Sequence, residues 1–176
     1  MDNPLQRMKQ QVSAEDYDRL LVVGEETDGV GVHKINERVY DRMRREVWPS
    51  RDEPLPYRAR YFRHKTEPLS CWLMMALELA LVLECEQPTD CLESRNATLQ
   101  VHKDVTMPYP ATSAVVLFGE GMNGGELVFP ELRLGVSITE NCVITFDGAN
   151  VEHGVTKLKP RTDDSWRVSL TYYIPK

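Results

Sequence analysis

Residues 167–174 have the sequence RVSLTYYI, in which two kinds of side chain alternate. In an extended strand, successive side chains point to opposite faces of the sheet. Residues of this strand would therefore divide between its faces, with Arg167, Ser169, Thr171 and Tyr173 on one face and Val168, Leu170, Tyr172 and Ile174 on the other. The stretch predicts a sheet strand that presents Arg167 and Ser169 from the same face.

Short segments with strand-like patterns precede this one from residue 98 onward. Turn-forming residues separate them, among them Gly124-Gly125, Asp147-Gly148 and Pro160. The segments that we predict as strands are 98–104, 114–119, 126–129, 134–138, 142–147 and 151–156. Many short strands after leading helices favour a double-sheet jelly roll of the cupin type.

The first half of the chain has patterns that are typical of helices. A capping box followed by apolar residues at helical spacing predicts a first helix over 13–21. A second helix is predicted over 36–48, with Asn36 as its cap. Residues 58–63 predict a strand, whereas 71–85 fit either a helix or a buried strand. The predicted class is therefore α+β, with N-terminal helices supporting a β core.

The length and composition fit one folded domain. With 176 residues, of which 41% are hydrophobic, the chain can bury a core without disulfides. We expect a single domain over 1–176, in which a helical and basic support region (1–97) precedes a β core (98–176) that carries the chemistry.

The charge of the chain is uneven. The formal net charge is -6, so no global basic field indicates a nucleic acid partner. Between residues 36 and 65, however, nine Lys/Arg exceed five Asp/Glu, a local surplus of +4. A solvated helix face and an edge strand explain that surplus without any partner.

The cysteines and the N-terminal residues indicate the cellular compartment that we expect for the protein. The four cysteines show neither C-x-x-C pairing nor zinc-like spacing, which is typical of free thiols in a reducing compartment. Residues 1–12 are polar and charged, unlike a signal peptide. We expect a monomer in the nucleus or cytoplasm, neither secreted nor bound to a membrane.

Three side chains form a candidate metal site. His102 and Asp104 are two residues apart and share one face of the predicted strand, while Lys103 faces away. His153 would reach the same point from a later strand. Two imidazoles and one carboxylate hold non-haem iron(II) on one triangular face and leave three positions open for chemistry. Zinc also accepts this ligand set, and a chance arrangement is the alternative without a metal.

Arg167 and Ser169 form a candidate anion site after the distal histidine. A guanidinium binds a carboxylate through two parallel charge-assisted hydrogen bonds, and a hydroxyl two residues along adds a third. Iron oxygenases hold a second carboxylic acid, their cosubstrate, whereas a zinc hydrolase gives no reason for this pair. A surface ion pair would be the default explanation of an isolated arginine.

These motifs resemble the 2-oxoglutarate- and iron(II)-dependent dioxygenase superfamily over about residues 98–174. They are H-K-D at 102–104, G-G-E-L-x-F-P at 124–130, F-D-G at 146–148, H-G-V at 153–155 and R-x-S at 167–169. The resemblance implies a double-stranded β-helix core and an enzyme whose cofactors are Fe(II), 2-oxoglutarate and O2. It also implies His102, Asp104 and His153 as iron ligands, Arg167 and Ser169 as the cosubstrate anchor, and release of succinate and carbon dioxide.

Two subgroups of the superfamily fit these motifs. The compact ending is similar to TET/JBP-type nucleic acid oxygenases, which oxidise the methyl group of 5-methylcytosine or thymine. The G-G-E-L-x-F-P stretch also resembles prolyl 4-hydroxylase-like enzymes, but those usually carry lysine where this chain has Arg167. The arginine favours DNA as the partner, with Arg58, Arg60 and Arg63 on phosphates and Asn123 beside the substrate. A small-molecule hydroxylase and a binding module without turnover are the alternatives.

Overall fold

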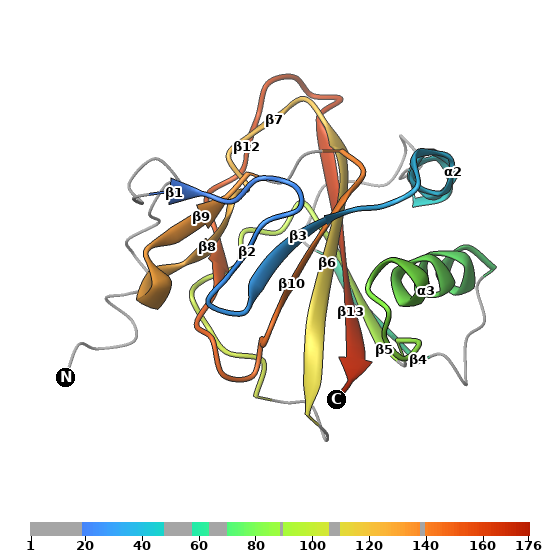
Figure 1. The fold of residues 1–176 in the computed structure, drawn as a ribbon. Helices are drawn as coiled ribbons and strands as arrows, with labels where there is room; N and C mark the ends of the chain where they lie inside the picture. The colour runs from blue at the N-terminus through green and yellow to red at the C-terminus, as the bar shows by residue number, and fades with distance from the viewer. Residues whose placement is uncertain (1–18, 48–57, 64–69, 89, 106–109, 138–139) are drawn as a thin grey trace.

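The computed structural model describes residues 19–47, 58–63, 70–88, 90–105, 110–137 and 140–176, to which the following statements refer. Two β-sheets pack against each other (Figure 1). In this described part, the larger sheet has seven strands in the order β2-β3-β10-β6-β13-β5-β4, and the smaller has four in the order β1-β9-β8-β11. A two-stranded ribbon, β12-β7, completes the architecture. The predicted α+β jelly roll is confirmed.

The larger sheet is built from antiparallel pairs throughout. Its strands are Glu26–Thr27 (β2), Val30–Lys34 (β3), Cys142–Phe146 (β10), Ala111–Glu120 (β6), Trp166–Pro175 (β13), Asp90–Arg95 (β5) and Arg58–Arg63 (β4). The smaller sheet and the ribbon consist of Arg19–Leu20 (β1), Leu134–Val136 (β9), Leu127–Phe129 (β8), Gly154–Val155 (β11), Met122–Asn123 (β7) and Lys159–Pro160 (β12), with a short 3-10 helix at Pro130–Leu132 (η2).

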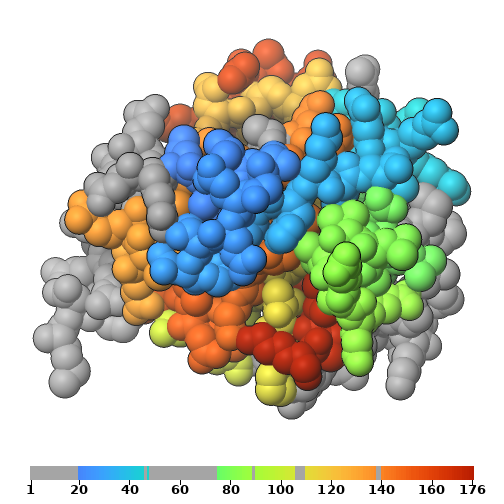
Figure 2. Space-filling model, viewed as in Figure 1, coloured from blue at the N-terminus to red at the C-terminus, as the bar shows by residue number. Residues whose placement is uncertain are grey.

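Two helices, α2 (Glu37–Val47) and α3 (Ser70–Val82), cover one face of the larger sheet (Figure 1). Asn36 caps α2 as predicted, since its Oδ1 accepts hydrogen bonds from the backbone N–H of Arg38 at 3.0 Å and of Val39 at 3.4 Å. The ambiguous segment at 71–85 is largely helix α3. Its Glu78 carboxylate accepts a hydrogen bond from the backbone N–H of Asn36 at 3.1 Å. The two helices therefore lie together on the surface (Figure 2).

The sheet has an apolar core on each face. The helix-side core lies under α2 and α3 and includes Met43, Met75, Leu79, Val116, Phe118, Val143, Val168, Leu170 and Tyr172. The inter-sheet core lies between the two sheets and includes Val30, Val32, Val115, Leu127, Phe129, Leu134, Val136, Ile144 and Phe146. The predicted alternation in β13 is confirmed, because its even-numbered residues Val168, Leu170, Tyr172 and Ile174 all belong to the helix-side core.

Two predictions of local structure were wrong, and some strands were not predicted. Residues 98–104 form no strand, because their backbone groups bond to separate segments: that of His102 to His153 and that of Asp104 to Gly148. Arg19 and Leu20 form β1 rather than the end of a helix, because a parallel partner, β9, is available to them. Residues 13–18 of that predicted helix lie outside the described residues. The hairpin β2–β3 was not predicted. Strands β5, β7 and β12 were not predicted either. The remaining strands, β4, β6, β8, β9, β10, β11 and β13, lie within three residues of their predicted limits.

No helix in the described ranges is long and apolar enough to cross a membrane.

Candidate active site

His102 and His153 are brought together by the backbone. Each donates its N–H to the carbonyl of the other, at 2.9 and 3.0 Å, and their ring centroids lie 4.4 Å apart. Gly154 permits this approach, since a Cβ there would lie 3.1 Å from the backbone N of Val101 and 3.2 Å from the carbonyl O of Leu99. The glycine of the H-G-V motif therefore lets the two histidine-bearing segments run side by side.

Asp104 is held by the turn that contains Gly148. Its backbone N–H donates to the Gly148 carbonyl at 2.7 Å, and the Ser113 hydroxyl donates to its Oδ2 at 3.0 Å. A Cβ at Gly148 would overlap both Asp104 Oδ2 and Ser113 Oγ. The F-D-G glycine thus leaves space for the carboxylate, and the serine fixes its orientation.

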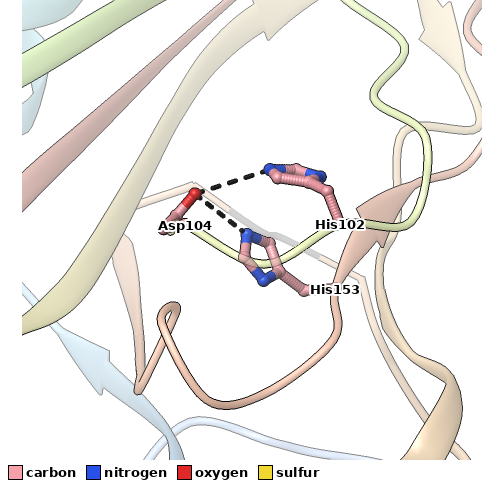
Figure 3. Close-up of side chains that lie close together, drawn as sticks. All are labelled: His102, Asp104 and His153. Atoms are coloured by element: carbon pink, nitrogen blue, oxygen red, sulfur yellow. Dashed lines mark ion pairs between the residues drawn. The ribbon is translucent and has the colours of Figure 1, made fainter. Parts of the chain in front are cut away.

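The three side chains converge as a metal site would require (Figure 3). Asp104 Oδ1 lies 3.5 Å from His102 Nε2 and 3.7 Å from His153 Nε2, and the three donor atoms all lie within 4.8 Å of one another. Each Nδ1 is instead paired with a backbone carbonyl, of Gln100 at 2.7 Å and of Val151 at 3.0 Å. Such bonds fix the tautomer that directs the Nε2 lone pair at a metal. The residues fit a divalent ion held by two histidines and one carboxylate.

The electrostatics of the site suit a cation. The hydrogen bond to Asp104 raises the pKa of His102 despite partial burial, whereas burial lowers the pKa of His153. Burial raises the pKa of Asp104, but the bonds from His102 and Ser113 and the charge of His153 outweigh it, so the net pKa is lowered. At neutral pH the carboxylate is therefore ionised and His153 is neutral, the forms that bind metal.

The two histidines differ in exposure. The His153 side chain is 6% exposed and packs against Phe146, with ring centroids 4.6 Å apart, whereas that of His102 is 39% exposed. Phe129 lies edge-on to Phe146 at 5.0 Å and continues this aromatic wall into the inter-sheet core. A metal held here would thus be shielded on the His153 side and accessible from the His102 side.

Arg167 forms a second polar centre on the same sheet face. Its side chain is buried, with Nη2 donating to the Gly125 carbonyl at 2.9 Å and Nη1 to the Ala97 carbonyl at 3.4 Å. Burial lowers its pKa to about 10, opposed by the nearby charge of Glu126, so it remains a cation at neutral pH. No carboxylate within the described ranges forms an ion pair with it. A buried cation without a paired anion is costly, which makes this a fitting place for an anionic ligand.

The strand β11 joins the two centres. His153 immediately precedes it and Thr156 immediately follows it; Thr156 bonds to the backbone N–H of Gly125, whose carbonyl accepts from Arg167. The three residues of extended chain from His153 to Thr156 span about 10 Å, a length comparable with that of a small molecule. Ser169 lies on the Arg167 face of β13 but donates to the Ser94 carbonyl at 3.4 Å, and its contact with a cosubstrate stays a prediction.

The candidate substrate residues lie elsewhere. In the register of the sheet, positions 58 and 60 align with Val168 and Leu170 of the helix-covered face, and position 63 aligns with Tyr173. Asn123 lies on the β7–β12 ribbon, where its Oδ1 accepts a hydrogen bond from Arg161 Nε at 2.7 Å. Neither the register of β4 nor the hydrogen bond of Asn123 links these residues to the metal ligands, and their roles stay predictions.

Two residues that support the centres, Ser113 and Thr156, were not predicted, and Glu126 was noted only as part of the G-G-E-L-x-F-P motif. They act through contacts between different segments, 9 residues apart for Ser113 with Asp104 and 30 residues apart for Thr156 with Glu126. Isolated serines and threonines carry no spacing signal, and the contact between Glu126 and Thr156 is visible only in the fold.

No protein-family model matches the sequence, and no curated protein matches it. Solved structures do match. They include an oxidoreductase of the 2OG-Fe(II) oxygenase family from Burkholderia pseudomallei, with 15% identity over 87% of this chain and 92% of that one (TM-score 0.57). The fold is that of the 2-oxoglutarate- and iron(II)-dependent oxygenases.

Two further matches represent the subgroups that the motifs suggested. The viral collagen prolyl hydroxylase of Paramecium Bursaria Chlorella virus-1, solved with 2OG, has 12% identity over 85% of this chain and 97% of that one (TM-score 0.55). NgTET1, solved in complex with 5mC DNA, has 14% identity over 84% of this chain and 72% of that one (TM-score 0.52). The oxygenase fold is thus shared with both subgroups to a similar degree.

Proposed function

We propose that this chain is a 2-oxoglutarate- and iron(II)-dependent dioxygenase that oxidises a substrate C–H bond. One observation carries the proposal: the His102–Asp104–His153 cluster lies at one end of β11, and at the other end Thr156 bonds to the turn whose Gly125 carbonyl accepts a hydrogen bond from the buried Arg167 guanidinium. The first fits a divalent metal and the second fits a carboxylate. A keto diacid such as 2-oxoglutarate presents a suitable group to each.

The residues of the site have separable roles in this proposal. His102 and His153 would hold iron(II) through Nε2 and Asp104 through Oδ1. Bound iron supplies the activation of dioxygen, coupled to conversion of 2-oxoglutarate to succinate and carbon dioxide. One carboxylate neutralises only one of the two metal charges, so the site still attracts an anionic keto acid. Arg167 orients its far end, while Phe146 excludes water beside His153.

Succinate release tests the proposal. Purified protein with iron(II), 2-oxoglutarate and oxygen should release succinate, and Asp104→Ala should reduce the rate to background. Asp163→Ala, which removes an exposed carboxylate from the loop before β13, is the matched control and should retain the rate. Equal rates in the wild type and Asp104→Ala would remove the assignment.

For the substrate, we propose the methyl group of a modified base in DNA, 5-methylcytosine or thymine. The arginine at position 167 and the likeness to a TET protein bound to 5mC DNA support this choice. A duplex base would have to be extruded to reach the metal. DNA binding should then weaken with salt and on neutralising the basic strand β4. Because position 63 aligns with the polar face, Arg63→Gln should weaken binding more than Arg58→Gln.

A second candidate, hydroxylation of a protein side chain such as proline, is favoured by the likeness to the viral collagen prolyl hydroxylase. Mass spectrometry distinguishes the two candidate functions. Methylated DNA, unmethylated DNA and a peptide panel are each incubated with the protein and then measured. A gain of one oxygen on a peptide, with unchanged DNA, would favour this candidate. Tight binding of iron and 2-oxoglutarate without any product would instead indicate a binding module.

A further inference from the structure

Thr156 organises the turn that contacts Arg167. Its Oγ1 accepts hydrogen bonds from the backbone N–H of Gly125 at 2.9 Å and of Glu126 at 3.1 Å, and it donates to the Glu126 carboxylate Oε2. Thr156 is 5% exposed, and these three bonds use the donor and both acceptor positions of its hydroxyl. The backbone of the turn and the side chain of Glu126 are therefore held by one buried group.

This turn also touches the guanidinium. The Gly125 carbonyl accepts from Arg167 Nη2 at 2.9 Å, and a Cβ at Gly125 would lie 3.2 Å from Arg167 Cζ. The next residue, Glu126, carries a charge close enough to raise the pKa of Arg167, yet within the described ranges it forms no ion pair with it. A carboxylate thus lies near the anion-binding arginine but is bonded to a threonine instead.

We propose that Thr156 is a positioning residue of the cosubstrate subsite, which holds the Glu126 carboxylate apart from Arg167 and keeps the guanidinium available for a dicarboxylic acid. The inference rests on the proposed function, which assigns 2-oxoglutarate as that acid. Without the hydroxyl, the flexible Glu126 side chain gains by pairing with the buried cation, because a buried charge is stabilised by an opposite one. That internal pair then competes with the cosubstrate.

Two substitutions, alone and combined, test this. Thr156→Val keeps the size of the side chain and removes the hydroxyl, and Glu126→Gln removes the competing charge. The dissociation constant of 2-oxoglutarate is measured by calorimetry with Mn(II) replacing iron, alongside KM and kcat for succinate release. Thr156→Val should weaken binding about tenfold, the scale of one charge-assisted hydrogen bond, and raise KM more than it lowers kcat.

The rescue distinguishes positioning from a general structural role. Adding Glu126→Gln to Thr156→Val should restore most of the lost affinity, and Thr156→Ser, which keeps a hydroxyl, should bind nearly as the wild type. Thr98→Val is the matched control, since Thr98 Oγ1 accepts from the neighbouring Leu158 N–H at 3.3 Å and does not touch Glu126. It should leave the affinity unchanged.

If Thr156→Val binds 2-oxoglutarate with unchanged affinity, the inference is overturned while the proposed function stands. The same holds if Glu126→Gln does not restore the affinity that Thr156→Val loses. Wild-type protein that binds Mn(II) but not 2-oxoglutarate overturns the proposed function as well. If Thr156→Val does not fold, the Glu126→Gln single variant decides. Removing a nearby negative charge should tighten binding about twofold or more, and equal or weaker binding overturns the inference.

Discussion

The two faces of the larger sheet use the same strands for different purposes. On the helix-covered face, β6 and β13 contribute Phe118, Val168 and Leu170, which are all 0% exposed and apolar. On the opposite face, the same strands contribute Ser113 and Arg167, which are also buried but polar. Because successive side chains of a strand point to opposite faces, one sheet can bury an apolar core on one face and hold a polar site on the other.

The difference shows where each face gains or loses free energy. Buried apolar groups on the helix-covered face are stabilised by leaving water. Buried polar groups on the other face must be compensated by hydrogen bonds, such as those from Ser113 to Asp104 and from Arg167 to Gly125. The helix-side core therefore supports a site that adds little stability itself, and substitutions on the two faces should separate stability from ligand binding.

The largest change in free energy is expected from Phe118→Ala, which acts on folding stability. Phe118 is fully buried and stacks on Tyr40 of α2, with ring centroids 4.8 Å apart. Its removal should lower the free energy of unfolding by about 3–5 kcal/mol, measured by urea denaturation of the metal-free protein. Leu81→Ala, at a position 76% exposed on α3, is the control and should change stability by less than about 0.5 kcal/mol. A Phe118→Ala protein that keeps its stability but loses metal affinity would break the division between faces.

Next in size is Ser113→Ala on the site face. Its hydroxyl is the side-chain donor to Asp104 Oδ2, so metal affinity should fall about 10- to 100-fold, as for other groups that orient a metal ligand. Mn(II) titration measures the change, and the exposed Ser137→Ala is the control. An unaltered Mn(II) affinity would mean that the serine does not orient the ligand.

Much of the fold could be predicted because alternation in β13 and β6 is strong and local. The failures are where tertiary pairing decides. Residues 98–104 have a strand-like pattern, but His102 and Asp104 bond to different segments, and no ladder forms. Likewise Leu20 belongs to a strand because β9 lies beside it, although its spacing suggested a helix.

The candidate site could be predicted only for residues with distinctive chemistry. Histidine and aspartate at metal-ligand spacing, and arginine followed by serine, are rare enough to be recognised. Ser113 and Thr156 are common residue types that no local pattern links to Asp104 and Glu126, and the role of Glu126 within the G-G-E-L-x-F-P motif depends on its contact with Thr156. The assignment of a DNA-binding surface to β4 suffers from the same problem, since the face of each residue depends on register.

A smaller effect is expected from Arg167→Lys, which keeps the charge but not the planar fork. A lysine cannot bind a carboxylate through two parallel hydrogen bonds, so the KM for 2-oxoglutarate should rise about tenfold. Steady-state succinate release measures it, with the melting temperature checked because Arg167 also bonds to Gly125 and Ala97. A lower kcat at unchanged KM would place the arginine outside the cosubstrate subsite.

The smallest expected effect is the pH dependence of stability and metal affinity that the titration of His102 produces near neutral pH. Its folded pKa is raised above the usual 6.5 mainly by Asp104, so the protonated pair stabilises the metal-free protein below the unfolded pKa. That stability is lost as pH rises through the folded pKa, whereas metal affinity increases over the same range because binding needs a neutral imidazole. NMR titration of the metal-free protein should show the raised pKa of His102 and its return towards 6.5 in Asp104→Asn. If the pKa of His102 were the same in both proteins, Asp104 would not be its partner. The convergence of the His102 and Asp104 side chains would then be in doubt.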